Sequence, residues 1–383
     1  MFRIIPRQGI FHFKRQFHSI LKERSPVESF ERKLAGYLDI KNVAATGSAT
    51  LSLYLILKQI KKTDRDEVIL SGYNYYDLVN VIVYCGMKPI FVDIKKDLQM
   101  DINNIKKSVT KNTRAILVTY LFGFPCDIKK ILKIAKKDDI YVIEDCSHAL
   151  GACIENKKLG SFGDFGIFSF NRWKIIDCFG GGAIASNNDK IMMQIKKKIR
   201  EYKQPSKVEM GKRILFNYLS WFLLSRKVFN LFIFPAVYLF HLLGKDILFD
   251  LSKDNLTDKF SDKKKRRFTE LQAAIGLKML DHIDYLNTER RKRYEALNKS
   301  AKNKAITQVK VNIFPTLFPV YTDDKKNVRS LLLKNGVDMI DKFYGYSFTK
   351  NNIEEKLILL PIHVTIKNSD LTYIASILNQ TKV

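Results

Sequence analysis

The sequence lacks the short patterns that mark several common kinds of site. It has no GxxxxGK[ST] phosphate loop, no HExxH motif and no cysteine-histidine zinc spacing. The glycines of GSFGDFG (160–166) do not follow the GxGxxG order in a strand-turn-helix setting. Phosphate-loop and zinc-dependent chemistry are therefore without support in this sequence, and nicotinamide binding has little.

Cysteines are few, and none belongs to a CxxC pair. All five fall in or beside apolar runs, which predicts reduced core residues of a cytoplasmic protein. The start of the chain is basic, but Pro6, Gln8, His12 and Lys14 interrupt its apolar residues. We therefore expect no secretion signal there.

Acidic residues are scarce relative to basic ones. The 383 residues include 66 Lys and Arg but only 39 Asp and Glu, which gives a formal charge of +27. Such a surface should attract anions, among them nucleic acid, nucleotide phosphates and acidic lipid headgroups. Because the charges are scattered over helices and no recognised binding module accompanies them, we expect no nucleic-acid partner.

Short apolar runs alternate with amphipathic stretches between residues 40 and 190. The helical stretches are 49–62, 76–86 and 127–138. The runs that read as strands are 68–70, 89–93, 114–122, 140–145, 166–170 and 181–186. This alternation predicts an α/β fold with a mostly parallel sheet covered by helices, in which ligands bind beyond the carboxyl ends of the strands.

Residues 268–302 have the pattern of one long amphipathic helix that leads into a smaller C-terminal α+β unit. We expect a large domain over residues 1–280 and a small domain over 281–383. The large domain contains an apolar helical insertion, residues 204–262.

The most apolar part of this insertion is 213–243, which Arg226 and Lys227 divide into two halves. A transmembrane helix needs about 20 apolar residues, and neither half is that long. Two interpretations remain: a pair of helices on the surface of an anionic membrane, or a helical hairpin buried against a second subunit. Basic clusters at 196–200 and 263–267 favour the membrane surface.

Lys174 lies between an apolar strand and the glycine row 180–182. A lysine in a dry pocket loses its charge easily and becomes a nucleophile for carbonyl carbon, as in Schiff-base enzymes. Pyridoxal phosphate enzymes surround that lysine with a carboxylate for the pyridine nitrogen and donors for the phosphate. Asp145, which ends the run YVIED, is a candidate for the carboxylate, although a strand-end Asp also commonly caps the next helix.

Candidate phosphate donors occur at two places. Gly47 and Ser48 precede a predicted helix, where backbone N–H groups and the helix dipole favour an anion. A Gly-Ser pair is also a common helix cap. Ser169, in the run FSF, points away from its two phenylalanine neighbours and needs a polar partner.

In order, these pieces resemble the DegT/DnrJ/EryC1/StrS family of sugar aminotransferases, which are pyridoxal phosphate enzymes of fold type I. The resemblance covers most of the chain outside residues 204–262. The blocks that carry it are 45–53, 68–94, 120–131, 142–152, 159–174, 180–189, 267–280 and 360–374.

The resemblance implies roles for several residues. The pattern FSFxxxK places the Schiff-base lysine at Lys174. The pattern EDxxHxxGA places the partner of the pyridine nitrogen at Asp145 and a residue near the ring hydroxyl at His148. The helix start and FSF imply phosphate donors at Gly47, Ser48 and Ser169.

Two further positions follow from the same resemblance. The aromatic residue that stacks on the cofactor corresponds to Tyr75, with Tyr73 as the alternative. The position of the asparagine that usually reaches the phosphate of the partner subunit is taken by Lys265, a departure from the family pattern.

The implied activity is transfer of an amino group from glutamate to a keto sugar carried on a nucleotide or a lipid, for a cell-surface polysaccharide or glycolipid. The implied state is a cytoplasmic homodimer, peripheral to the membrane if 213–243 binds lipid. Relatives that dehydrate keto-deoxy sugars have histidine in place of the lysine, so Lys174 favours transamination. Dehydration, or an inactive sensor or scaffold, remains the alternative.

Overall fold

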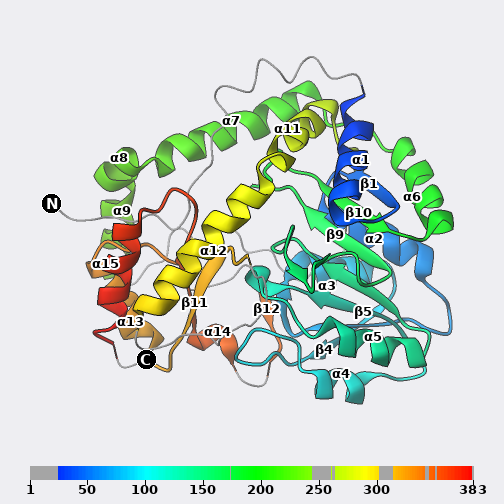
Figure 1. The fold of residues 1–383 in the computed structure, drawn as a ribbon, viewed down its shortest axis with the longest axis horizontal. Helices are drawn as coiled ribbons and strands as arrows, with labels where there is room; N and C mark the ends of the chain where they lie inside the picture. Colours follow the sequence, from blue (N-terminus) through cyan, green and yellow to red (C-terminus); the bar gives the residue numbers. More distant parts are fainter. Residues whose placement is uncertain are drawn as a thin grey trace.

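The computed structural model describes residues 25–172, 174–243, 260, 264–301, 314–340, 345–349 and 352–381. Its centre is a seven-stranded sheet with strand order β1-β10-β9-β6-β5-β2-β4 (Figure 1). In chain order the strands are β1 (Asn42–Thr46), β2 (Glu67–Ser71), β4 (Lys88–Val92), β5 (Thr113–Thr119), β6 (Tyr141–Asp145), β9 (Phe165–Ser169) and β10 (Gly182–Ser186).

Most neighbouring strands of this sheet are parallel. The pairs β4-β2, β2-β5, β5-β6 and β6-β9 are parallel, whereas β10 is antiparallel to both β9 and β1. Side chains alternate between the two faces, as a pleated strand requires. In β2, Ile69 belongs to the core on one face, and Val68 and Leu70 belong to the core on the other.

Helices cover both faces of the sheet. One core contains buried residues of the helices α2 (Ala49–Ile60), α3 (Tyr76–Tyr84) and α6 (Asp189–Glu201). The other contains those of α1 (Pro26–Leu38), α4 (Ile102–Ser108), α5 (Ile128–Lys137) and α11 (Glu270–Leu280). These three layers confirm the predicted α/β class and the mostly parallel sheet.

Two predicted elements were wrong in extent. The strand expected over 114–122 ends at Thr119, and the chain then forms a 3-10 turn, Leu121–Gly123. A continuous apolar run does not distinguish a strand from a buried turn. The single helix expected over 268–302 is two helices, α11 and α12 (Ile283–Ser300), separated by Asp281 and His282. The two helices pack on different partners, α11 on α1 and α12 on α15 (Asn368–Leu378).

The C-terminal residues form a smaller group of elements at the end of α12 (Figure 1). Strands β11 (Leu317–Tyr321) and β13 (Leu357–Pro361) form an antiparallel pair flanked by α13 (Lys325–Lys334), and α15 packs on α12 and α13. A short strand, β12 (Gly345–Ser347), pairs instead with β3 (Tyr73–Tyr75), and α14 (Ile353–Lys356) precedes β13. The expected domain boundary at residue 280 stays a prediction.

The apolar segment consists of helices along one side of the molecule (Figure 1). They are α7 (Lys207–Leu224), α8 (Arg226–Val228), a π-helical turn (Phe229–Ile233) and α9 (Phe234–Leu242). In the described part of the chain no single helix is long and apolar enough to cross a membrane, although α7 and the following helix, bent by 58°, would suffice together by length and composition. Residues 244–259 and 261–262 of the predicted insertion lie outside the described residues.

Candidate active site

Three polar side chains meet where β5 and β6 end. Asp145 closes β6 and is paired in register with Thr119, the last residue of β5. The amide Nδ2 of Asn74, in β3, donates to Thr119 Oγ1 at 2.8 Å. This is the carboxyl edge of the parallel strands, where the alternating pattern of the sequence predicts a ligand site.

The carboxylate of Asp145 is buried but only partly satisfied. The residue is 6% exposed, and the hydrogen bonds described for its carboxylate both come from Ser147, whose N–H and Oγ donate to Oδ1 at 3.0 and 2.6 Å. Burial raises the pKa of Asp145, while Ser147 and the charge of Lys174 lower it. Among the described residues Oδ2 accepts no hydrogen bond, so this oxygen is available to a cationic N–H group.

The preceding residue, Glu144, is the opposite case. Its side chain points to the other face of β6, where Tyr120 Oη donates to it at 2.5 Å. The backbone N–H groups of Gly160, Phe162 and Gly163 donate to it at 3.0, 2.7 and 2.7 Å. Glu144 is thus fully committed to holding the 160–163 loop, and only Asp145 is left for a ligand.

Lys174 lies in the loop between β9 and β10, and its Nζ is 2.6 Å from His148 Nε2. Burial lowers the pKa of Lys174 to about 8, although the charge of Asp145 acts in the opposite direction. Burial also lowers the pKa of His148 well below its usual value, and the charges of Lys174 and Arg290 add to that effect. The structure therefore brings Lys174, Asp145 and His148 into one electrostatic environment.

The ring of His148 is held from its other side. Phe122 donates its backbone N–H to Nδ1 at 3.3 Å, and its ring stacks on the imidazole with centroids 5.8 Å apart. Since Nδ1 accepts, the hydrogen of the neutral imidazole is on Nε2 and points to the Lys174 amine. Phe122 has φ 54°, a left-handed conformation that is unfavourable for a bulky side chain. In this conformation the backbone N–H and the ring of Phe122 both contact the imidazole on the side away from Lys174.

The glycine row brings β10 against the start of α2. Gly180 and Gly181 have φ of 109° and 111°, which only glycine adopts readily. At Gly182 a Cβ would collide with the backbone of Ser48 and Ala49. Any side chain larger than hydrogen would push the start of α2 away from the sheet.

The predicted phosphate donors are neighbours as a result of this packing. Ser169 is paired in register with Gly182, and Ser48 forms a bridge with Gly181. Ser48 also caps α2 by accepting from the Leu51 N–H at 3.1 Å. A Cβ on Gly47 would meet the carbonyl of Arg266, so packing alone requires glycine there.

The remaining predicted residues lie in different surroundings. Tyr73 is 2% exposed in the core, whereas Tyr75 is half-buried at the start of α3, which makes Tyr75 the better placed of the two for stacking on a ligand. The Lys265 Nζ lies over the rings of Tyr54 and Tyr84, 5.3 and 5.5 Å from their centroids. Its expected contact with a phosphate of the partner subunit stays a prediction.

Sequence reasoning missed three residues of this region. Ser147 orients Asp145, Phe122 orients His148, and Arg290 acts on His148 from α12. The Asp-x-Ser spacing was a usable signal for Ser147, because such side chains often bond to the residue two positions away. Phe122 and Arg290 had no local signal, since their roles depend on contacts between distant segments.

The family model of the DegT/DnrJ/EryC1/StrS aminotransferase family matches residues 18–216 of this chain. The chain is 34% identical over 167 residues to GDP-perosamine synthase of Vibrio cholerae, a match covering 43% of this chain and 46% of that protein. It is 32% identical over 173 residues to a UDP-N-acetyl-3-dehydro-alpha-D-glucosamine 3-aminotransferase of Acidithiobacillus ferrooxidans, covering 45% and 46%. The chain thus spans about half the length of the curated relatives it matches.

Solved structures share the whole fold. Helicobacter pylori PseC, an aminotransferase involved in the biosynthesis of pseudaminic acid, superimposes with a TM-score of 0.76 over 99% of both chains at 19% identity. This similarity extends over the elements after residue 216, where the match to the family model ends. It confirms the expected fold type I architecture.

Proposed function

The chain belongs to the DegT/DnrJ/EryC1/StrS aminotransferase family, and we propose that it transfers an amino group from glutamate to the keto carbon of a sugar carried on a nucleotide. The observation that carries this proposal is the contact between Lys174 and His148 at the sheet edge that also holds Asp145. The family's aminotransferases depend on pyridoxal phosphate. When bound, this group supplies an electron-accepting ring that stabilises negative charge at the carbon next to the amino nitrogen.

The residues present fit that group. Lys174 would hold it covalently, Asp145 has an oxygen available for a pyridine N–H, and Tyr75 would lie against the ring. The start of α2 at Ser48 and the hydroxyl of Ser169 would hold its phosphate, because backbone N–H groups at a helix start favour anions.

Lys174 and Asp145 would act on different protons of the reaction. With a pKa of about 8, Lys174 is neutral in about a tenth of molecules at pH 7, against about one in a few thousand for an ordinary lysine. The neutral Lys174 amine accepts a hydrogen bond from His148 Nε2–H, which orients the lone pair of the amine. Lys174 would then take and return the proton at the α-carbon of the amino donor. Asp145 would keep a ring nitrogen protonated while Ser147 holds its carboxylate in place.

The direct test supplies the purified protein with pyridoxal phosphate, glutamate and a panel of 3-keto and 4-keto nucleotide sugars. Formation of 2-oxoglutarate together with a sugar product that has gained nitrogen supports transamination. A product that has lost water without gaining nitrogen indicates the dehydratase instead. A protein that produces neither, with no cofactor absorbance sensitive to Lys174→Ala, fits an inactive sensor or scaffold.

The proposal includes a homodimer with shared active sites. The segment around Lys265 and Arg266 approaches the start of α2 in its own chain, and the family pattern assigns it to the phosphate of the partner's site. Mixing Lys174→Ala with Lys265→Ala protein tests this arrangement, since a mixed dimer regains one intact site only if Lys265 serves the partner. Activity no higher than that of the separate variants counts against shared sites.

The proposal also places the enzyme at the cytoplasmic surface of a membrane. One side of α7 exposes Leu215, Phe216, Leu219 and Phe222, which are 69%, 56%, 50% and 54% exposed. Spacings of three and four residues put these side chains on one stripe. Such a stripe, on a helix that follows the basic cluster 196–200 in the sequence, suits insertion into an anionic lipid surface.

The same helix contacts the loop of the catalytic lysine. Arg172 donates to Ser220 Oγ at 2.8 Å and lies over the ring of Phe216, 4.4 Å from its centroid. Of the two charged residues at the bend, Arg226 forms a two-point ion pair with the buried Asp370. A site next to a lipid-binding helix would suit an acceptor sugar carried on a polyprenyl lipid as well as on a nucleotide.

A further inference from the structure

Arg290, on α12, differs from the other arginines of its helix. Its Nε and Nη1 atoms are buried, and the structure describes no hydrogen-bond partner for either. The guanidinium of Arg293 is bonded to the carbonyls of Glu289, Val364 and Ile366 and to the carboxylate of Glu289, at 2.7 to 3.0 Å. Arg291 pairs with Glu295 at 2.7 Å. The unsatisfied donors are therefore specific to one position and not a general property of this helix.

The position of Arg290 follows from its neighbours on the helix. One turn earlier, Asn287 Nδ2 donates to the Leu150 carbonyl at 3.0 Å. One turn later, the Tyr294 ring packs edge-on against Phe124 with centroids 5.8 Å apart. Residues at these spacings lie on one side of a helix.

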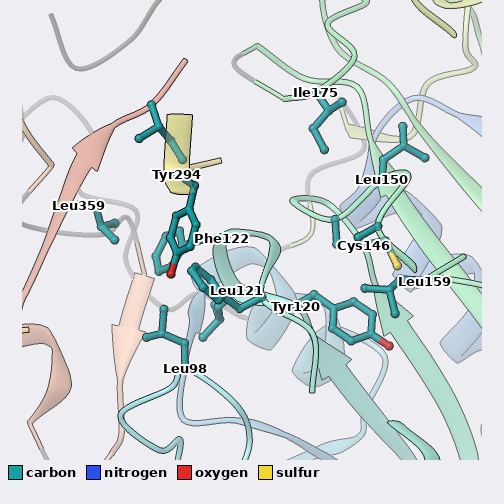
Figure 2. Packing of buried hydrophobic residues seen from close by; sticks show 14 of the residues in the cluster. Leu98, Tyr120, Leu121, Phe122, Cys146, Leu150, Leu159, Ile175, Tyr294 and Leu359 are labelled. Carbon is teal, nitrogen blue, oxygen red and sulfur yellow. The ribbon is translucent and has the colours of Figure 1, made fainter. Parts of the chain in front are cut away.

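The two anchors belong to the turns that carry the candidate site. Leu150 follows His148 in one turn, and Phe124 follows Phe122 in the other. In Figure 2, Phe122 and Tyr294 belong to the same buried cluster as Leu150. Arg290 therefore faces the region between the two turns, on the His148 side of the site.

The electrostatic environment of Arg290 favours the binding of an anion. Burial lowers its pKa to about 10, which keeps it protonated at neutral pH, and its charge helps to lower the pKa of His148. No carboxylate among the described residues forms an ion pair with it. A guanidinium whose Nε and Nη1 are buried with neither a counter-charge nor a hydrogen bond is unfavourable, and an anion in contact with it removes that cost.

We propose that Arg290 binds an anionic group of a substrate, either the carboxylate of the amino donor or a phosphoryl group of the activated sugar. Both sources present the same chemistry, oxygen atoms that carry negative charge, and the guanidinium suits both. This inference rests on the proposed function, because both anions belong to its substrates. It adds a substrate-binding role for α12, a helix outside the sheet edge where Lys174 and Asp145 lie.

Binding measurements that require no turnover test the proposal. The full-length protein loaded with pyridoxal phosphate is titrated calorimetrically with glutarate, a donor-like dicarboxylate without the amino group, and separately with pyrophosphate. Arg290→Gln should weaken binding of one probe about 10- to 100-fold, the usual range for loss of a charged hydrogen bond. Loss for glutarate identifies the donor carboxylate, and loss for pyrophosphate identifies the sugar phosphate.

The matched control is Arg291→Gln, which removes the same charge from the next position, where the side chain is 39% exposed and paired with Glu295. It should leave both affinities unchanged. Arg290→Met is a second variant that keeps the aliphatic stem, and it should fold at least as stably as the wild type because it removes a buried unpaired charge.

Equal affinities in the wild type and both Arg290 variants, or no binding of either probe to the wild type, would overturn the proposal. A purely structural role predicts that both variants lose stability while the folded fraction keeps both affinities. Failure of the proposed transamination is a separate result, since it appears as absence of turnover in the wild type whatever the titrations show.

Discussion

The candidate site and the outer side of α7 are incomplete in opposite ways. At the site, polar groups have too few partners among the described residues: Oδ2 of Asp145 at the sheet edge, and the buried Nε and Nη1 of Arg290 on α12. On α7, apolar side chains such as Leu215 and Phe222 are exposed with too little cover. Folding normally pairs buried polar atoms and hides apolar surface. Each region therefore points to something outside the single chain, an ionic ligand in the first and an apolar surface in the second.

Lys174→Ala should produce the largest effect at the sheet edge. Transamination should fall by at least about a thousandfold, within the range that a positioned proton-transfer group supplies. The turnover rate of the purified variant, with its circular dichroism spectrum as a check on folding, measures this loss. Lys130→Ala, which removes an exposed lysine from α5, is the control and should keep full activity. A fully active Lys174→Ala protein would show that Lys174 is not the catalytic lysine.

The consecutive carboxylates of β6 should separate catalysis from stability. Asp145→Asn should lower kcat about 100-fold, comparable to removal of one group that stabilises developing charge, with little change in Tm. Glu144→Gln should instead lower the free energy of unfolding by about 1 to 3 kcal/mol, because buried N–H donors lose an acceptor. Steady-state kinetics and thermal melts of both variants measure the changes in kcat and in stability side by side. A loss of stability in Asp145→Asn together with a loss of kcat in Glu144→Gln would contradict these roles.

Lys174 should also lower the free energy of unfolding of the cofactor-free protein. Its pKa falls from 10.5 in the unfolded chain to about 8 in the fold, so at pH 7 the folded state bears a penalty of up to about 3 kcal/mol for keeping the proton. Lys174→Met should therefore raise the free energy of unfolding at pH 7. The gain should shrink as the pH rises from 8 towards 10.5, where the unfolded chain also releases the proton.

Urea unfolding of the wild type and the Lys174→Met variant at pH 7 and pH 9 measures this gain. A variant less stable than the wild type at pH 7 would mean that Lys174 is not held in a dry environment. A gain that grows between the two pH values would give the pKa shift the wrong sign.

The smallest effect is expected on α7. Leu219→Asp combined with Phe222→Asp should weaken binding to anionic liposomes about tenfold or more, since burial of each such side chain contributes about 1.5 to 3 kcal/mol. Tyr285→Asp, which alters an equally exposed side chain on α12, is the control in the same pelleting assay. Should the double variant pellet like the control but change the oligomeric state, α7 faces a second subunit instead.

The sequence predicted the core of this molecule better than its connections. The six predicted strands and the helices at 49–62, 76–86 and 127–138 are all present, because their periodicity reflects burial on one or two faces. The apolar run predicts strand at Phe122, where the structure has a turn, and its continued spacing predicts helix across the break at Asp281. Both interruptions occur where apolar spacing continues although the backbone changes direction.

The candidate site was predictable to the extent that its residues occupy short motifs. The sequence could place Asp145 at a strand end, and it could relate Lys174 and His148 to a family pattern. It could not reveal that Phe122 fixes the imidazole or that Arg290 approaches His148 from α12. Those contacts join segments 26 and 142 positions apart in the sequence, and local patterns contain no information about such distances.

The central claim is that Lys174 holds pyridoxal phosphate beside Asp145, and reductive trapping tests it most directly. The full-length protein is incubated with the cofactor, reduced with borohydride, digested and mapped by mass spectrometry. We expect a phosphopyridoxyl group on Lys174, with much weaker labelling in Asp145→Asn. A label on other lysines with Lys174 unmodified would contradict it.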